Sequence, residues 1–140
     1  MRRKGRIILY SILAAYILLL LYLAVFSREP ANKSIVWLDL LGGYTHPKYN
    51  SVSNGLLNIC SFIPIGVLVS LIASKYRIGK SVLVGLLVSV VIEVSQLISR
   101  RGVFDVDDLL NDVVGALVGS LLVVLVMHIR GKAPVRESFE

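Results

Sequence analysis

Four long apolar runs constrain the fold of this chain more than any other feature of its sequence. They cover residues 7–26, 56–74, 81–98 and 109–129, and apart from Glu93 and Asp112 the acidic, lysine and arginine residues lie outside them. A bilayer core about 30 Å thick is crossed by roughly 20 apolar residues in an α-helix. The pattern therefore predicts an all-α, polytopic membrane protein in which four transmembrane helices form one bundle. A chain of 140 residues has room for this single domain, residues 1–140, and no second one.

The composition agrees with a membrane protein. Hydrophobic residues make up 56% of the chain and charged residues 17%, whereas a soluble domain carries about a quarter charged residues. The formal net charge of +6 raises the question of nucleic-acid binding. The chain has no basic helix face with interleaved aromatic residues and no zinc-ligand spacing, so no nucleic-acid partner is expected.

The first apolar run follows four basic residues, as the apolar region of a secretory signal peptide does. That region of a signal peptide is only about 7–15 residues long, and an A-x-A-like cleavage site comes after it. The run at 7–26 is longer, and no such site follows it. We therefore expect an uncleaved first span.

Basic residues near the ends of the runs predict the orientation, because cytoplasmic loops carry an excess of lysine and arginine. With the N-terminus inside, the cytoplasmic side holds ten of them: Arg2, Arg3, Lys4, Arg6, Lys75, Arg77, Lys80, Arg130, Lys132 and Arg136. The outer side holds five: Arg28, Lys33, Lys48, Arg100 and Arg101. Both termini are therefore predicted to be cytoplasmic.

On three of the runs, polar residues recur at helical spacing together with a phenylalanine or glycines, so each set shares one helix face. The sets are Asn58, Ser61 and Phe62 on the second run, Ser89, Glu93, Gln96 and Arg100 on the third, and Asp108, Asp112, Gly115 and Gly119 on the fourth, with Asn111 at the edge. Glu93 lies roughly 8 Å from the outer end of its helix at 1.5 Å per residue. These polar groups are predicted to meet at one level and form an outward-facing polar pocket.

Two interpretations of this polar cluster are open. Ionisable residues inside a membrane usually have a function, because burying them in lipid is costly. Alternatively, Glu93 pairs with Arg100 or Arg101 and only holds helices together. Gly115-x-x-x-Gly119 is a small-residue packing signature, and because four helices are few for an enclosed pocket, it could also mediate a homodimer.

The segment from Arg100 to Asp108 is short and densely charged. Its three carboxylates could hold a divalent cation, most simply at Asp105 and Asp108, although the spacing is not that of an EF-hand. Asp107 and Asp108 could instead cap the next helix. Arg100 and Arg101 could grip a carboxylate or phosphate, or pair with the acidic residues that follow them.

The first long loop contains an apolar segment, Ile35 to Leu41, with Trp37, Tyr44 and Tyr49 in or near it. Aromatic rings of this kind suit the boundary between water and lipid. The segment could form a short helix on the outer surface or a loop resting on the helix ends.

The motifs together resemble the VanZ-like family over residues 54–120, about half the chain. The matching pattern is Asn58-x-x-x-Phe62-x-Pro64-x-Gly66, Glu93-x-x-Gln96, Arg101-Gly102-x-Phe104-Asp105-x-Asp107-Asp108 and Gly115-x-x-x-Gly119. The resemblance implies a small multi-pass protein of the bacterial plasma membrane, in a family whose namesake is associated with low-level resistance to teicoplanin, a lipid-tailed glycopeptide. The residues it marks are Asn58, Phe62, Pro64, Gly66, Glu93, Gln96, Arg101, Asp105, Asp108 and Gly115. One departure is Asp112, where the family usually has asparagine, with Asn111 beside it.

Three functions are compatible with these residues. The favoured one is a non-enzymatic accessory protein without a cofactor, whose pocket binds an amphiphile such as a lipoglycopeptide or a lipid-linked wall precursor. The second is an intramembrane enzyme acting on a lipid phosphate or ester, with Glu93 as base, Arg101 as anion ligand and a metal held by Asp105 and Asp108. Ion transport is least favoured, because the inner halves of the runs carry almost no polar side chains.

Overall fold

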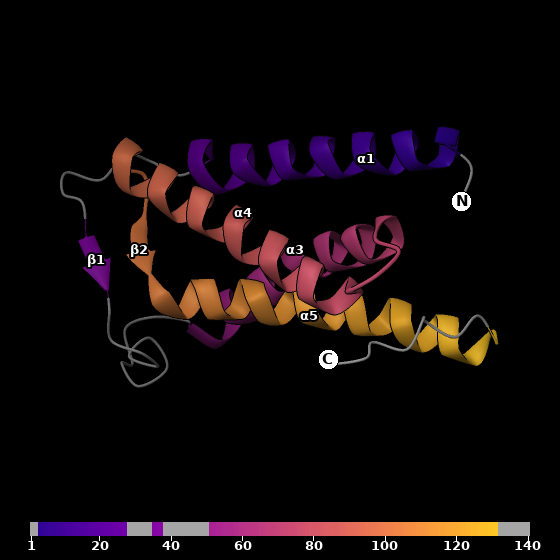
Figure 1. The fold of residues 1–140 in the computed structure, drawn as a ribbon. Helices are drawn as coiled ribbons and strands as arrows, with labels where there is room; N and C mark the ends of the chain where they lie inside the picture. The colour runs from indigo at the N-terminus through magenta and orange to yellow at the C-terminus, as the bar shows by residue number, and fades with distance from the viewer. Residues whose placement is uncertain (1–2, 28–34, 38–50, 132–140) are drawn as a thin grey trace.

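The computed structural model describes residues 3–27, 35–37 and 51–131. Within these ranges four helices are long and apolar enough to cross a membrane. They are α1 (Arg3–Leu21), which continues as the π-helical turn η1 (Tyr22–Phe26), α3 (Ser51–Ile72), α4 (Arg77–Ser99) and α5 (Val106–Ile129). Figure 1 shows α1 and α5 on opposite sides of the bundle, with α3 and α4 between them. The prediction of a helical membrane protein with four spans is confirmed. Residues 28–34 and 38–50, which include Tyr44 and Tyr49, lie outside the described part of the chain.

The helices are longer than the apolar runs. α3 begins at Ser51 and α4 at Arg77, whereas their runs begin at 56 and 81. Hydropathy marks the part of a helix that suits lipid, while the helix itself continues as long as its backbone hydrogen bonds do. Pro64 lies inside α3, where neighbouring helices of a membrane bundle can accommodate the missing N–H group.

The closest packing in the bundle is between α3 and α5, because glycines at the contact leave no side chain between the two backbones. A methyl group placed on Gly115 would overlap the carbonyl oxygen of Ile59, and one on Gly119 would overlap that of Ile63. Gly66 meets the backbone of Ala116 in the same way. We call the contact formed by Gly66, Gly115 and Gly119 the glycine seam. Small residues let membrane helices approach this closely, so the packing interpretation of the motif is confirmed.

The glycine seam also bears on the predicted homodimer. Gly115 and Gly119 are buried against α3 of the same chain. In this structure both glycines pack within one chain, and a dimer contact through them stays a prediction.

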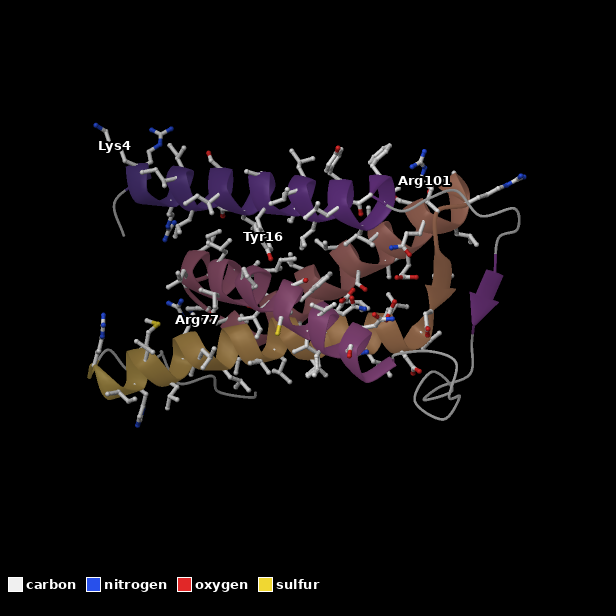
Figure 2. All side chains as sticks on the ribbon, turned by 180° about the vertical axis from the view of Figure 1, so that it is seen from behind. Lys4, Tyr16, Arg77 and Arg101 are labelled. Carbon is white, nitrogen blue, oxygen red and sulfur yellow. The ribbon has the colours of Figure 1, made fainter. Side chains whose placement is uncertain are left out.

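α1 packs less deeply than the other helices and has no fully buried residue. Its side chains Leu13, Tyr16 and Ile17 rest on the core formed by Phe62, Ile65, Val69, Val88 and Ile92. Tyr16 points into the bundle (Figure 2) and donates a hydrogen bond to the carbonyl oxygen of Ser61 at 2.9 Å. The first helix is thus held mainly by side chains that lie on the surface of the other three helices.

Two short strands join the loops at one end of the bundle. β1 (Ile35–Trp37) and β2 (Val103–Asp105) pair in parallel, with Val36 opposite Phe104. We call this end, where α1 and α4 finish and α5 begins, the sheet end (Figure 1). Of the two alternatives for the segment from residue 35, neither a surface helix nor a loop describes residues 35–37, because these residues hydrogen-bond to a distant strand instead. Residues 38–41 lie outside the described residues.

Candidate functional site

A cavity of about 600 Å³ opens between the helices near the sheet end. In Figure 2 oxygen atoms gather between the helices in this half of the bundle. One wall is apolar and comes mainly from α1, η1 and α3, with Leu20, Leu23 and Leu57 among its residues. The polar wall comprises Asn54, Asn58, Ser61, Glu93, Gln96, Asp105, Asp108 and Asp112. The cavity therefore combines a lipid-like surface with a dense set of polar groups.

Glu93 stands at the centre of the polar wall. It is 2% exposed, and its Oε2 accepts a hydrogen bond from the backbone N–H of Asp105 at 3.0 Å. The carboxylate of α4 thereby holds strand β2, which leads into α5. Glu93 thus lines the cavity and also positions strand β2, while its predicted pairing with Arg100 or Arg101 stays a prediction.

Gln96 lies one turn further along α4 and is 2% exposed. Its Nε2 donates to the carbonyl oxygen of Ala24 at 3.2 Å, which ties α4 to η1. Its Oε1 is buried and has no hydrogen-bond partner in the described residues. Gly102 leaves room for this oxygen, since a Cβ atom at that position would lie only 2.6 Å from it.

Asp112 on α5 completes the polar wall opposite α4. It is 4% exposed, and its Oδ2 accepts a hydrogen bond from the Ser89 hydroxyl at 2.6 Å. Its Oδ1 is buried without a partner in the described part of the chain. The stripes predicted on the third and fourth runs do face each other here, and the pair formed by Ser89 and Asp112 fixes their register.

The polar residues of α3 occupy the third side. Asn58 is half-buried and lines the cavity, as predicted, together with Ser61 and Phe62. Asn54 also lines it and was missed by the sequence analysis. It lies one turn before Asn58 on the same face, and starting the helix at 51 rather than 56 would have revealed it.

Asp105 immediately precedes α5. Its extended backbone leaves the strand, and its Oδ1 accepts the N–H of Asp107 at 2.9 Å. Asp105 is thus the N-cap, and the expectation that Asp107 or Asp108 takes this role is wrong. Both lie in the first turn of the helix, where their negative charge is favourable, as the sequence analysis expected. Burial raises the pKa of Asp105, the hydrogen bond from Asp107 opposes this rise, and the charge of Asp107 adds to it.

Three predicted binding residues lie outside the cavity lining. Arg100 ends α4 in a left-handed conformation (φ 55°) and is exposed, so the stripe on α4 stops at Gln96. Arg101 donates to the carbonyl oxygen of Phe26 at 3.4 Å and lies 5.9 Å from the centre of its ring, beside the end of η1 (Figure 2). Asn111 is half-buried and is not among the residues that line the cavity.

The carboxylates of the site do not form an evident metal centre. Among residues 3–27, 35–37 and 51–131, no group of three or more His, Cys, Asp or Glu side chains is placed to hold a metal ion. Asp105 and Asp108 both line the cavity, but the capping bond already uses one oxygen of Asp105.

When the sequence is compared with known protein families, residues 7–127 match the VanZ/LLP1 family. The chain belongs to the VanZ/LLP1 family. The match covers all four membrane helices and confirms the resemblance drawn from the motifs. No curated protein and no solved structure matches the chain.

In this VanZ/LLP1 protein most of the motif residues fall into two groups, with Pro64 and Arg101 outside both. Asn58, Glu93, Gln96, Asp105 and Asp108 line the cavity. Gly66 and Gly115, with Gly119, form the glycine seam, and Phe62 is 3% exposed in the core beside them. The motif thus specifies both the packing of α3 on α5 and the polar wall that this packing leaves open.

Proposed function

We propose that this protein is a non-enzymatic accessory protein of the bacterial plasma membrane that binds the polar head of an amphiphile in the cavity at its sheet end. It would contribute to resistance to teicoplanin-type lipoglycopeptides or to homeostasis of the cell envelope. Membership of the VanZ/LLP1 family supports the link to teicoplanin. The observation that carries the proposal is the two-sided cavity, in which an apolar wall suits an acyl chain and a polar wall suits a headgroup.

The proposal requires the sheet end to face the cell exterior. The distribution of basic residues supports this orientation, since Lys75, Arg77 and Lys80 lie at the opposite end of the bundle. In Figure 2 the labelled Lys4 and Arg77 lie toward that end, away from Arg101.

Cysteine labelling in intact cells tests the orientation. Cys60 is exposed, so Cys60→Ser provides the background, and Lys75→Cys and Arg100→Cys each add one exposed thiol. An impermeant maleimide should label residue 100 and should label residue 75 only after the cells are lysed. Labelling of residue 75 in intact cells would show that the cavity opens to the cytoplasm.

Antibiotic sensitivity tests the function. Deletion should raise sensitivity to teicoplanin and leave sensitivity to vancomycin, which lacks the lipid tail, unchanged. Glu93→Gln preserves an oxygen that can accept the Asp105 N–H, so the protein level on an immunoblot should remain normal while protection is lost. Arg100→Gln, on the same helix but outside the lining, should protect like the wild type. Equal changes for both antibiotics would contradict the proposal.

The alternative of an intramembrane enzyme has one specific observation in its favour, the buried Glu93 carboxylate beside a 600 Å³ cavity. The role it gives to Arg101 has less support, because that guanidinium lies over Phe26 rather than in the lining. Purified protein incubated with lipid phosphates and esters, with and without Mg²⁺ or Mn²⁺, should show no turnover if the accessory role is right.

A further inference from the structure

The charged residues of the cavity lining all have the same sign. Glu93, Asp105, Asp108 and Asp112 contribute carboxyl groups, and no Lys, Arg or His side chain is among the described residues that line the space. A phosphate or carboxylate headgroup finds no cationic side chain in this lining and would be repelled by each carboxyl group that is ionised.

Two buried acceptors in the lining also lack a donor. Oδ1 of Asp112 and Oε1 of Gln96 have no hydrogen-bond partner in the described residues, and both side chains are at least nine-tenths buried. Gln96 cannot satisfy this need by turning its amide around, because its Nε2 already donates to Ala24. A buried polar atom without a partner costs free energy, so a ligand that supplies N–H or O–H donors would complement these two atoms.

The apolar wall indicates what carries these donors. Leu20 and Leu23 of the first membrane helix, Leu57 of α3 and Ile92 of α4 lie around the same space as the carboxyl groups. A chain of methylene groups packs on such a wall, while a protonated amine has three donors and no acceptor. An ammonium ion also offsets the charge of the carboxylates, which a sugar hydroxyl cannot do.

We propose that the cavity selects amphiphiles with a protonated amine on the headgroup, which is held among Glu93, Asp105 and Asp112 while the chain lies on Leu20, Leu57 and Ile92. This names the ligand class for the proposed function and rests on it. The amine belongs to the amphiphile itself, whether that molecule is a lipid or an antibiotic.

Photo-crosslinking of the purified protein in phosphatidylcholine nanodiscs tests the proposal. Three probes share one twelve-carbon chain with a diazirine and differ in the headgroup, which is a primary amine, a phosphate or a glucoside. The crosslinked peptides are mapped by mass spectrometry. We expect the amine probe to label the cavity peptides around Leu20, Leu57 and Ile92 roughly tenfold more than the phosphate probe, the ratio that a charge-assisted hydrogen bond provides. The glucoside should fall between them.

Two variants make the result specific. Asp112→Asn keeps the shape and an oxygen for the Ser89 hydroxyl, and Asp105→Asn keeps a good N-cap, so both should fold, as checked by size exclusion. Each should lower cavity labelling by the amine probe several-fold and change labelling by the glucoside little. Arg100→Gln, exposed outside the lining, should leave all three probes unchanged.

The outcomes separate this proposal from the proposed function. Cavity labelling by the phosphate probe that equals or exceeds labelling by the amine probe would overturn the amine selectivity, as would labelling by the glucoside alone. Either result would leave the cavity as an amphiphile site. If none of the three chains labels the cavity peptides, both proposals fail.

Discussion

The glycine seam and the polar cavity are two regions of one bundle in which the helices pack in opposite ways, in close contact in the seam and apart around the cavity. In the seam, α3 and α5 touch through backbone because Gly66, Gly115 and Gly119 have no side chains. In the cavity, α1, α3, α4 and α5 stay apart around about 600 Å³ lined by carboxyl and amide groups. The same helix α5 takes part in both, with Asp112 facing the cavity and Gly115 and Gly119 facing α3.

The difference shows how a small membrane bundle keeps a polar space open without a large scaffold. Association of membrane helices depends on close van der Waals packing, because lipid offers no hydrophobic drive between them. The seam provides that packing. The stability it contributes offsets the cost of burying Glu93, Gln96 and Asp112 on α4 and α5. Substitutions in the seam should therefore remove the protein, while conservative ones in the cavity should remove its function.

The largest effect is expected from Gly119→Val. The new side chain would overlap the backbone of α3 at Ile63, which cannot move aside as a flexible side chain could. The cost should reach about 3 kcal/mol or more, the upper part of the overpacking range. The protein level in membranes should fall sharply.

Gly79→Ala is the matched control for this prediction. Nothing lies within 4 Å of a Cβ atom at Gly79, near the start of α4. Alanine is a better helix former than glycine by about 1 kcal/mol, so this variant should be at least as abundant as the wild type. Equal losses for both variants would show that the seam has no special role.

A smaller loss is expected from Ser89→Ala, which leaves Oδ2 of Asp112 without the donor it has at 2.6 Å. Leaving a buried acceptor unpaired costs about 1–3 kcal/mol. The change should be measured by thermal unfolding in detergent. Ser95→Ala on the same helix is the control, because its hydroxyl donates only to the Val91 carbonyl of its own helix. A Ser89 variant as stable as the control would mean that the cavity wall contributes nothing to the fold.

Next comes Asp105→Ala, which removes the N-cap of α5 and the acceptor of the Asp107 N–H. Loss of such a cap costs about 1 kcal/mol, whereas asparagine caps nearly as well as aspartate. Asp105→Ala should therefore unfold at a lower temperature than Asp105→Asn. If the two variants unfold at the same temperature, the Asp105 carboxylate has a role other than capping.

The smallest effect is a pH dependence of the same residue. Because burial raises the pKa of Asp105, the folded protein holds this proton more tightly than the unfolded chain does. The stability this proton provides is complete below the ordinary pKa and is lost as the pH rises through the raised one. Asp105→Asn has no such proton, so its stability relative to the wild type should increase as the pH is raised from about 4 toward neutral. A difference independent of pH, measured by thermal unfolding in matched buffers, would contradict this.

The sequence alone determined the membrane class, the four spans and the stripe from Ser89 through Glu93 to Gln96. These follow from local rules, since an apolar run either is or is not long enough for a bilayer and residues four or three apart share a helix face. The resemblance of the sequence motifs to the VanZ-like family also required no structure, and the family match over residues 7–127 confirms the membership.

Only the tertiary structure decided how these elements meet. The left-handed turn at Arg100 removes that residue from the stripe, and the pairing of β1 with β2 joins segments far apart in the chain. It also decided that Gly115 and Gly119 face α3. The physical reason is that a glycine or an arginine has the same local pattern whichever surface it meets, and only the packing of all four helices selects that surface.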